Sequence, residues 1–418
     1  MVEQARTGLP PARVLPLIYV AVFGGYLGMQ VLTPILPPLA RELRLTEFQF
    51  GVITSASAVT IALVSPVWGR RSDRWGRKPV FVVALAGTTL GLLAFAVVAQ
   101  LGFHAVFAAP VLFALLLVAR GLLVGGALAG LPVGAQSYVA DVTDDERSRV
   151  RGVARVGASV GLALVLGPAV GGLLGGVDLV AALYVAPVVL AVTTVTVVLL
   201  LPPEPRHRDR VARPRLSPLD PRLWPFLLTG FGIYLSINLL QLSLGFLLQD
   251  RLGLTAGETA GLTGLALLLG GVPMLLVQAL VIPRLTWSPV RLLRVGIPIA
   301  AVAFVMIAVG GSAPMMLAGV ALSGLGHSLS VPGYNAAPTL LVAADEQGGV
   351  AGLIGSTNAV ALVVGPLVAT ALYAAWPPLP FVVGAAELAL VTLFVSLHPG
   401  MTRGRGAGSG NLGAAASV

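Results

Sequence analysis

The sequence predicts an all-α membrane protein with twelve transmembrane helices in two six-helix halves. Of its 418 residues, 56% are hydrophobic and only 10% are charged, and the mean hydropathy is +0.93. A soluble domain carries charge on about a quarter of its residues, so lipid rather than water is the main solvent here. Apolar stretches of about 20 residues recur along the chain, each long enough to cross a bilayer as a helix. They are continuous rather than alternating, which excludes a β-barrel.

The expected spans follow one another with short connections, and their edges are placed to within several residues. Glycine and proline are frequent inside them, as is normal for membrane helices. The first span is too long for a cleavable signal peptide and lacks a clear small-residue cleavage site. The twelve spans are 14–40, 48–69, 79–100, 107–138, 150–176, 179–201, 223–249, 257–282, 290–309, 313–341, 350–374 and 379–398.

The basic residues predict the orientation. With a cytoplasmic N-terminus, 21 of the 26 Lys and Arg residues fall in inner segments. That asymmetry follows the positive-inside rule, so the net charge of +9 is a topology signal and no nucleic-acid partner is expected. We therefore expect a multi-pass protein of the plasma membrane, here a bacterial inner membrane, with both termini cytoplasmic. The absence of cysteine excludes disulfides and thiolate metal sites, and we expect no cofactor and no metal.

Two sequence matches divide the chain into similar halves. DDERSRVRG (144–152) matches ADEQGGVAG (344–352) at an offset of 200, and GPAVGGLL (167–174) matches GPLVATAL (365–372) at an offset of 198. Paired repeats of this kind build many secondary transporters. The expected units are an N-terminal bundle (1–201), a Pro- and Arg-rich cytoplasmic linker (202–222), a C-terminal bundle (223–398) and a disordered tail (399–418).

The connection between the second and third spans, GRRSDRWGRKPV (69–80), holds five Arg or Lys residues and one Asp. A positive-inside loop needs no glycine or acid at fixed offsets, so the spacing G-x-x-x-D-R-x-G-R-K indicates more than topology. Asp73 can pair with Arg77, and Gly76 permits a tight turn. The residues of this spacing are Gly69, Asp73, Arg74, Gly76, Arg77 and Lys78.

This spacing resembles the signature loop of the major facilitator superfamily, and the resemblance extends over the whole chain. It implies two pseudo-symmetric six-helix bundles and a cytoplasmic latch that joins them when the transporter is open outward. Asp73 would then face Arg77 and the start of the eleventh span near residues 349–352. Asp141, Glu146 and Arg147 match the family's loop between spans four and five and would extend the charge network. The second-half counterpart (283–294) has lost both the Asp and the paired glycines.

Two further features resemble this family. Arg120 lies inside the fourth span, where the resemblance implies a role in proton transfer, although a snorkelling or structurally paired arginine is the alternative. The fifth span holds the core G-P-x-x-G-G, which resembles the signature of the antiporter branch, mostly drug exporters; close helix packing would also explain such glycines. The residues of this core are Gly167, Pro168, Gly171 and Gly172.

The resemblance implies a central cavity lined by spans one, four, seven and ten. Helical spacing selects aromatic and polar faces on these spans, and packing against neighbouring helices is the alternative for each aromatic residue. The candidate cavity residues are Tyr26, Gln30, Tyr138, Tyr234, Asn238, Gln241 and Tyr334. Such a cavity suits a bulky, amphiphilic, neutral or weakly charged compound. The first span contains no acid, so the candidates for proton coupling are Arg120, His327, Glu387 and Asp178.

We therefore expect a proton-linked exporter of small amphiphilic organic compounds that works by alternating access, as a monomer in the lipid bilayer. An importer, metabolite facilitator or lipid flippase of the same fold shares every feature except the glycine core. A structural or receptor-like membrane protein is disfavoured by the half-repeats. No enzymatic activity is expected, because the chain has no HExxH or comparable catalytic pattern and no GxxxxGK[ST] phosphate loop.

Overall fold

The computed structural model describes residues 11–143, 146–202, 216–343 and 346–402, and these contain helices but no strand. In chain order the helical elements are α1 (Pro11–Val31), α2 (Leu36–Glu42), α3 (Glu47–Trp75), α4 (Arg77–Phe103), α5 (Ala109–Leu116), η1 (Leu117–Val124), α6 (Gly125–Leu128), α7 (Gly130–Val142), α8 (Glu146–Val177), α9 (Leu179–Leu200), α10 (Trp224–Leu252), α11 (Ala256–Leu276), η2 (Val277–Val281), η3 (Ile282–Arg284), α12 (Pro289–Val309), α13 (Ala313–Ala336), η4 (Pro338–Leu341), α14 (Gln347–Ala375), α15 (Leu379–Leu397) and α16 (Pro399–Thr402).

Twelve of the segments so formed are long and apolar enough to cross a membrane, which confirms the predicted spans to within a few residues. The structure adds interruptions: the eighth span ends in η2 and η3 and the tenth in η4, and two further ones lie in the first bundle. The first span turns between α1 and α2, around Pro34, and the fourth contains a π-helical turn, η1. The expected tail is wrong in its first four residues: they form α16, in which Met401 is buried against the second bundle. Residues 403–418 and 203–215 lie outside the described part.

Local sequence signals explain several helix ends. Thr46 and Thr255 each form a capping box with the residue three positions later, and these boxes start α3 and α11. Gly76 separates α3 from α4 with φ +95°, a conformation that glycine adopts without steric cost. The predicted tight turn at Gly76 is confirmed.

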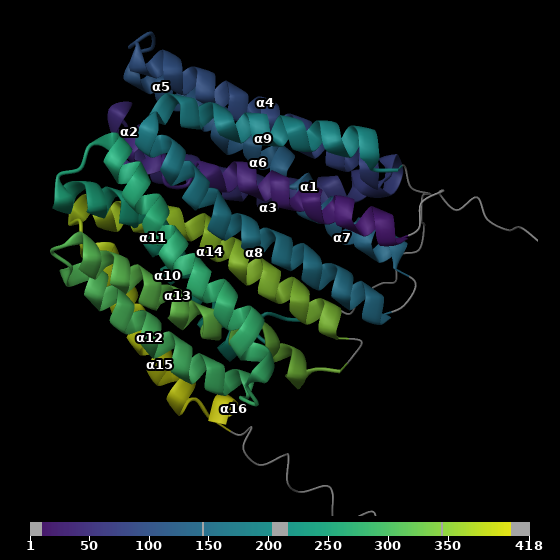
Figure 1. Ribbon diagram of the computed structural model, residues 1–418. Helices are drawn as coiled ribbons and strands as arrows, with labels where there is room; N and C mark the ends of the chain where they lie inside the picture. The colour runs from purple at the N-terminus through teal and green to yellow at the C-terminus, as the bar shows by residue number, and fades with distance from the viewer. Residues whose placement is uncertain (1–10, 144–145, 203–215, 344–345, 403–418) are drawn as a thin grey trace, which may run out of the picture.

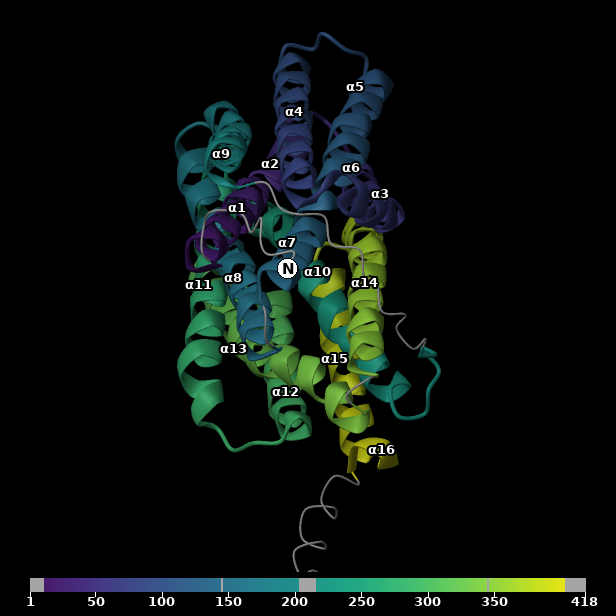
Figure 2. The same ribbon diagram turned by 90° about the vertical axis from the view of Figure 1, so that its right-hand side faces the viewer.

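The helices form two bundles, α1 to α9 and α10 to α16 (Figure 1). They meet along two seams, α3 against α14 and α8 against α11, and α2 also contacts α10 and α11. Figure 2 looks onto the end that carries most of the arginine-rich connections, which we call the basic end; there α8 and α14 lie on opposite sides of the view.

Glycines bring the helix backbones together along the seams, far from the basic end. A Cβ on Gly172 of α8 would lie 2.6 Å from Cα of Gly264 in α11. A Cβ on Gly51 of α3 would lie 2.9 Å from the carbonyl oxygen of Pro366 in α14. Real Cβ atoms do not come this close to backbone, so the observed contact between the bundles requires glycine at these positions.

An ion-pair network joins the bundles at the same end. Arg41 of α2 contacts the Asp250 carboxylate of α10, with Nη2 2.8 Å from Oδ2, and also Glu47 of α3 at 3.1 Å. The Tyr373 hydroxyl of α14 donates to the same Asp250 carboxylate. The Arg41 guanidinium lies 5.2 Å from the ring centre of Phe246. One arginine thus connects elements of both bundles, and side chains together with glycines close this end.

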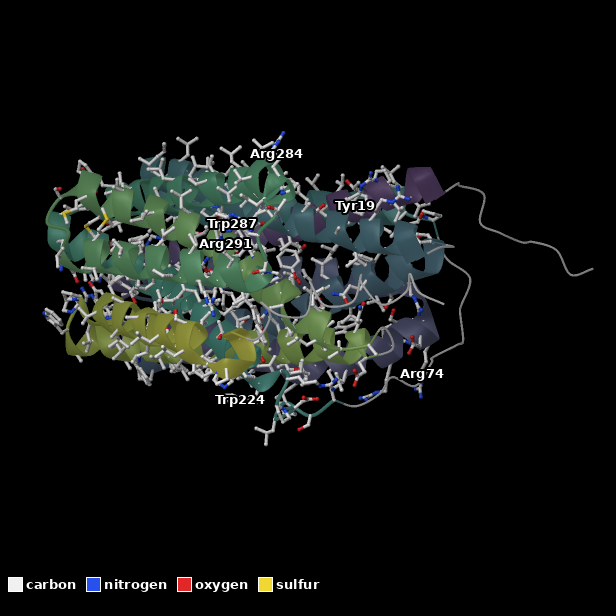
Figure 3. All side chains as sticks on the ribbon, turned by 90° about the horizontal axis from the view of Figure 1, so that it is seen from below. Tyr19, Arg74, Trp224, Arg284, Trp287 and Arg291 are labelled. Atoms are coloured by element: carbon white, nitrogen blue, oxygen red, sulfur yellow. The ribbon has the colours of Figure 1, made fainter. Side chains whose placement is uncertain are left out.

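The bundles separate toward the basic end. A Cβ on Gly157 of α8, or on Gly352 of α14, would meet no atom within 4 Å. In Figure 3, Arg284, Trp287 and Arg291 of the second bundle gather in one region, and Arg74 of the first bundle lies apart from them. The described close contacts between the bundles are thus concentrated at the end opposite the basic end, which we call the closed end.

A charge cluster at the basic end lies within the second bundle. Arg222 donates to Asp220 at 2.8 Å and to Glu346 at 3.2 Å, which ties the segment before α10 to the start of α14. Hydrogen bonds from Arg222 hold the pKa of both carboxyls below their ordinary values. The contact therefore contributes at neutral pH and is lost as the pH falls through the acid range.

Arg41→Ala should open the closed end, because it removes the charge that joins the bundles. The pair is partly exposed, so we expect about 1 kcal/mol, roughly a fivefold shift in the ratio of closed to open molecules. The chain has no cysteine, so spin labels can be placed at Val106→Cys and Gly311→Cys, and in a second protein at Val153→Cys and Thr286→Cys. Distances between the first pair should lengthen and those between the second pair should shorten.

Arg251→Ala is the matched control for this measurement. Arg251 lies on α10, directly after Asp250 and at the same end of the molecule, but it donates within its own bundle, to the carbonyl oxygen of Gly310 at 2.6 Å. Its loss should lower thermal stability without changing either distance distribution. Equal distributions in wild type and Arg41→Ala would contradict the assigned closure.

Gly264→Ala should also weaken the closed end. Its Cβ would lie 2.6 Å from both Cα of Gly172 and the carbonyl oxygen of Pro168, so the seam must separate, at a cost of about 1–3 kcal/mol. Gly261→Ala, one turn earlier on the same seam, would approach nothing closer than 3.8 Å and should be neutral or slightly stabilising. The same label distances and the melting temperature report both effects; identical behaviour of the two variants would contradict this packing.

Candidate functional site

A cavity of about 310 Å³ lies between the two bundles. Its wall combines apolar and polar side chains from both bundles. The first bundle contributes Tyr26, Met29, Gln30, Thr33, Leu36, Pro37, Phe50, Thr54, Ser57, Ala58, Ile61, Arg120, Leu128 and Pro132, and the second contributes Asn238, Gln241, Leu242 and Leu362. Spans one, two, four, seven and eleven therefore line it.

The structure places four of the predicted cavity residues in this wall: Tyr26, Gln30, Asn238 and Gln241. The two glutamines and the asparagine face one another from different bundles. Gln30 comes from α1, whereas Asn238 and Gln241 come from α10. The Asn238 amide nitrogen donates to the carbonyl oxygen of Tyr234 at 2.8 Å, which fixes how its side chain lies.

The other three predicted tyrosines are not in the wall, and this corrects the prediction. Tyr138 is fully buried within the first bundle, where its hydroxyl donates to the carbonyl oxygen of Pro202 at 3.0 Å. Tyr334 is also fully buried: Gly230 leaves room for its ring, which packs on Tyr234 with ring centres 6.2 Å apart. Helical spacing alone could not show this, because an aromatic face packs equally well on a neighbouring helix.

Arg120 is the one charged residue in the wall. It lies in the π-helical turn η1, whose neighbouring glycines let α3 approach: a Cβ on Gly125 would lie 2.7 Å from the carbonyl oxygen of Ser57. The Ser57 hydroxyl donates to the Arg120 carbonyl oxygen at 3.1 Å, which helps to satisfy the widened turn. The guanidinium Nη1 lies 3.7 Å from the sulfur of Met29.

His327 lies in the core of the second bundle, outside the cavity wall. Its Nδ1 is 2.9 Å from the carbonyl oxygen of Ser323, one turn earlier on α13. Its Nε2 is 3.0 Å from the Ser236 hydroxyl of α10, which is itself 2.7 Å from the carbonyl oxygen of Ile233. Nδ1 is also 3.2 Å from the Ser323 hydroxyl. In the tautomer with a proton on Nδ1, that proton faces the Ser323 carbonyl oxygen, and the Ser236 hydroxyl can donate either to Nε2 or to Ile233.

The two acidic candidates for proton coupling differ in their surroundings. Both carboxylate oxygens of Glu387 on α15 are buried against Gly232 of α10 and have no hydrogen-bond partner within the described residues. Asp178 is exposed and accepts from the backbone N–H groups of Val180 and Ala181 at 2.8 and 3.1 Å. Asp178 therefore has a sufficient structural explanation as the N-cap of α9.

The loop between α3 and α4 is built around Arg77. This buried side chain lies 3.4 Å from Asp73, as predicted, and donates to the carbonyl oxygen of Ser72 at 2.8 Å. Lys78 donates to the carbonyl oxygen of Val198 at 2.8 Å, while Arg74 is exposed. The start of α14 at Gly352 has open space around it, so the proposed cross-bundle half of the latch stays a prediction. The side chains of Asp141, Glu146 and Arg147 lie outside the described part.

The predicted glycine core of α8 packs in two directions. A Cβ on Gly167 would lie 3.0 Å from the carbonyl carbon of Gln30 in α1, a residue of the cavity wall, and Gly171 lies against the backbone of Val31. Gly172 and Pro168 form the seam with Gly264 of the other bundle. The core thus connects the cavity wall to the contact between the bundles.

Sequence reasoning missed the network around Arg41. One signal pointed to it: Arg41 is among only three basic residues in the expected outer loops, where positive-inside sorting disfavours cations. It also missed Ser236, since a lone serine in an apolar span carries no recognisable pattern.

Comparisons with known proteins agree with this architecture. The family model described as Major Facilitator Superfamily matches residues 18–366. The chain is 28% identical to the class C tetracycline resistance protein of Escherichia coli, covering 90% of this chain and 93% of that protein. It is 24% identical to multidrug resistance protein 1 of Bacillus subtilis, over 90% and 94% of the two chains.

Among solved structures, a bacterial homologue of the human lysosomal transporter Spinster, in an inward-facing and occupied conformation, superposes with a TM-score of 0.70. The two share 16% identity over 93% of this chain and 97% of that chain. The family model matches most of the chain, and the fold agrees with it. The protein belongs to the major facilitator superfamily.

Proposed function

We propose that the protein exports small amphiphilic organic compounds across the plasma membrane in exchange for protons, by alternating access. The observation that carries this proposal is the cavity between two bundles that contact each other at one end and separate at the other. With the basic end in the cytoplasm, we take the described arrangement as the inward-facing state, which would take up substrate. Breaking the Arg41 contact with Asp250 and closing the basic end would give the outward-open state.

Export rather than import is favoured by the glycine core of α8 and by the relatives. The chain is similar over about 90% of its length to tetracycline and multidrug resistance proteins. An importer or lipid flippase of the same fold is the second candidate, and the direction of transport separates the two. The relatives are transporters rather than enzymes, so no catalytic activity is proposed.

Proton coupling is proposed to run through His327. The site has hydrogen-bond partners for both protonation states: the Ser236 hydroxyl donates to Nε2 of the neutral ring, or turns to Ile233 when Nε2 itself carries a proton. Ser236 lies on α10, the helix that also carries Asn238 and Gln241 of the cavity wall. Protonation would therefore act on the helix that contacts the substrate.

Everted membrane vesicles test function and direction together. Vesicles from a host deleted for its own efflux pumps, with and without this protein, should be screened with a panel of fluorescent amphiphiles. An exporter fills such vesicles when their interior is acidified, and a protonophore abolishes the filling. Filling of the vesicles that is independent of the proton gradient would refute proton-driven export. Movement of the compound out of the vesicles would refute it as well.

Asp73→Asn should impair transport while leaving membrane insertion intact, because it removes the acid of the proposed latch. The initial rate in everted vesicles, normalised to the amount of inserted protein, measures this effect. A wild-type rate in Asp73→Asn would remove the latch assignment.

His327→Gln should separate coupling from movement of substrate. We expect proton-driven accumulation to fall by about tenfold or more, as for loss of a proton-transfer group, while exchange of labelled for unlabelled substrate changes little. Glu387→Gln is the matched variant, since it removes a buried carboxyl that also contacts α10. If Glu387→Gln loses coupling and His327→Gln retains it, the assignment to His327 is wrong.

A further inference from the structure

We infer that the cavity binds its substrates through an anionic group held by Arg120, so that organic acids and zwitterions with an apolar body are preferred over cations. This inference deepens the proposed function and rests on it, because it takes the cavity between the bundles as the substrate site.

The argument begins with an uncompensated cation. Arg120 is the only charged residue that lines the cavity, and no acid lines it. Within the described residues no ion pair to Arg120 is found, and the nearest acceptor of its guanidinium is the thioether of Met29, a weak one. A guanidinium carries five N–H donors and stays charged in proteins, so this site holds unused donors at the middle of a membrane span.

Such a site is costly without a partner and favours a ligand that supplies one. A charge away from water is stabilised by an opposite charge with hydrogen bonds, and a planar guanidinium fits a carboxylate, sulfonate, phosphate or enolate through two parallel bonds. The widened turn η1 and the close approach of α3 hold the backbone of Arg120 in place, which directs its side chain to the cavity wall.

The rest of the wall describes the rest of the ligand. Phe50, Leu242 and Leu362 offer apolar surface for a ring system. Asn238 and Gln241 add neutral hydrogen-bonding groups from the opposite bundle. A ligand with an acid at one end would thus bind Arg120 in the first bundle and amides in the second. A cationic compound would meet the like charge of Arg120 and no acid in this wall.

The resemblance of the fourth span to the family implies proton transfer for this arginine, and the two roles differ in what they predict. A residue that only relays protons does not decide which charge on the ligand is preferred. A residue that binds the ligand's anion does, and it acts on binding in the absence of any proton gradient. The test therefore measures binding at equilibrium.

The probes are three matched compounds: anthracene-9-carboxylate, anthracene-9-carboxamide and 9-(aminomethyl)anthracene. At neutral pH they are anionic, neutral and cationic, with the same ring system. Binding to the full-length protein in lipid nanodiscs is followed by the fluorescence of the probe, with empty nanodiscs subtracted. The wild type should bind the carboxylate roughly ten- to a hundredfold more tightly than the amide, and the amine most weakly.

Variants assign this preference to its residue. Arg120→Gln should bind all three probes with similar affinity, and Arg120→Lys should restore part of the preference for the carboxylate. Gln241→Leu, the control in the same wall, should weaken all probes while keeping their order. Melting temperatures identify variants that fail to fold. If Arg120→Gln fails to fold, Arg120→Lys still tests the inference.

Three results would overturn the inference. These are equal or tighter binding of the amine by the wild type, an unchanged preference in Arg120→Gln, and no saturable binding of any probe to a folded wild-type protein. None of them refutes proton-driven export, because vesicle transport is measured separately. Failure of transport together with a charge preference that depends on Arg120 would refute the export proposal and leave a specific anion site.

Discussion

The rest of the structure depends on the close contact of two helix bundles at one end of the molecule. In lipid there is little hydrophobic drive between helices, so contact must come from tight packing and a few polar bonds. Tight packing comes from Gly172 against Gly264, and a polar bond comes from Arg41 with Asp250. Among the described residues the closest contacts lie toward this end, and the cavity lies between the bundles beside them.

Ionisable groups within the spans differ in whether the protein satisfies them. His327 has a partner at each ring nitrogen, so its charge can change without leaving a buried polar atom unpaired. Arg120 in the cavity wall lacks such partners among the described residues. In the proposed mechanism this difference assigns two roles: His327, which has its partners, exchanges protons, and Arg120, which lacks them, binds the substrate.

The sequence was sufficient for the fold, because hydropathy, basic loops and half-repeats report on the lipid environment directly. It was sufficient for four of the seven predicted cavity residues, since polar side chains such as Gln30 and Gln241 have few other places to go inside a membrane. It failed for Tyr138 and Tyr334, whose rings fit a neighbouring helix as well as a cavity. It also failed for the Arg41 network, which joins residues about 209 positions apart in the chain and depends on how the bundles pack.

Coupling between proton and substrate needs an element that both of them contact, and α10 meets this condition. Ser236 faces His327, while Asn238 and Gln241 lie within about one and a half turns of it on the same helix and line the cavity. The C-terminal end of α10 carries Asp250, which pairs with Arg41 of the other bundle. In the proposed mechanism, a change of protonation at His327, a ligand on the amides and the closure of the bundles therefore all act on one helix. Any displacement of α10 that one of them favours alters the free energy of the other two, which is the thermodynamic requirement for coupled transport.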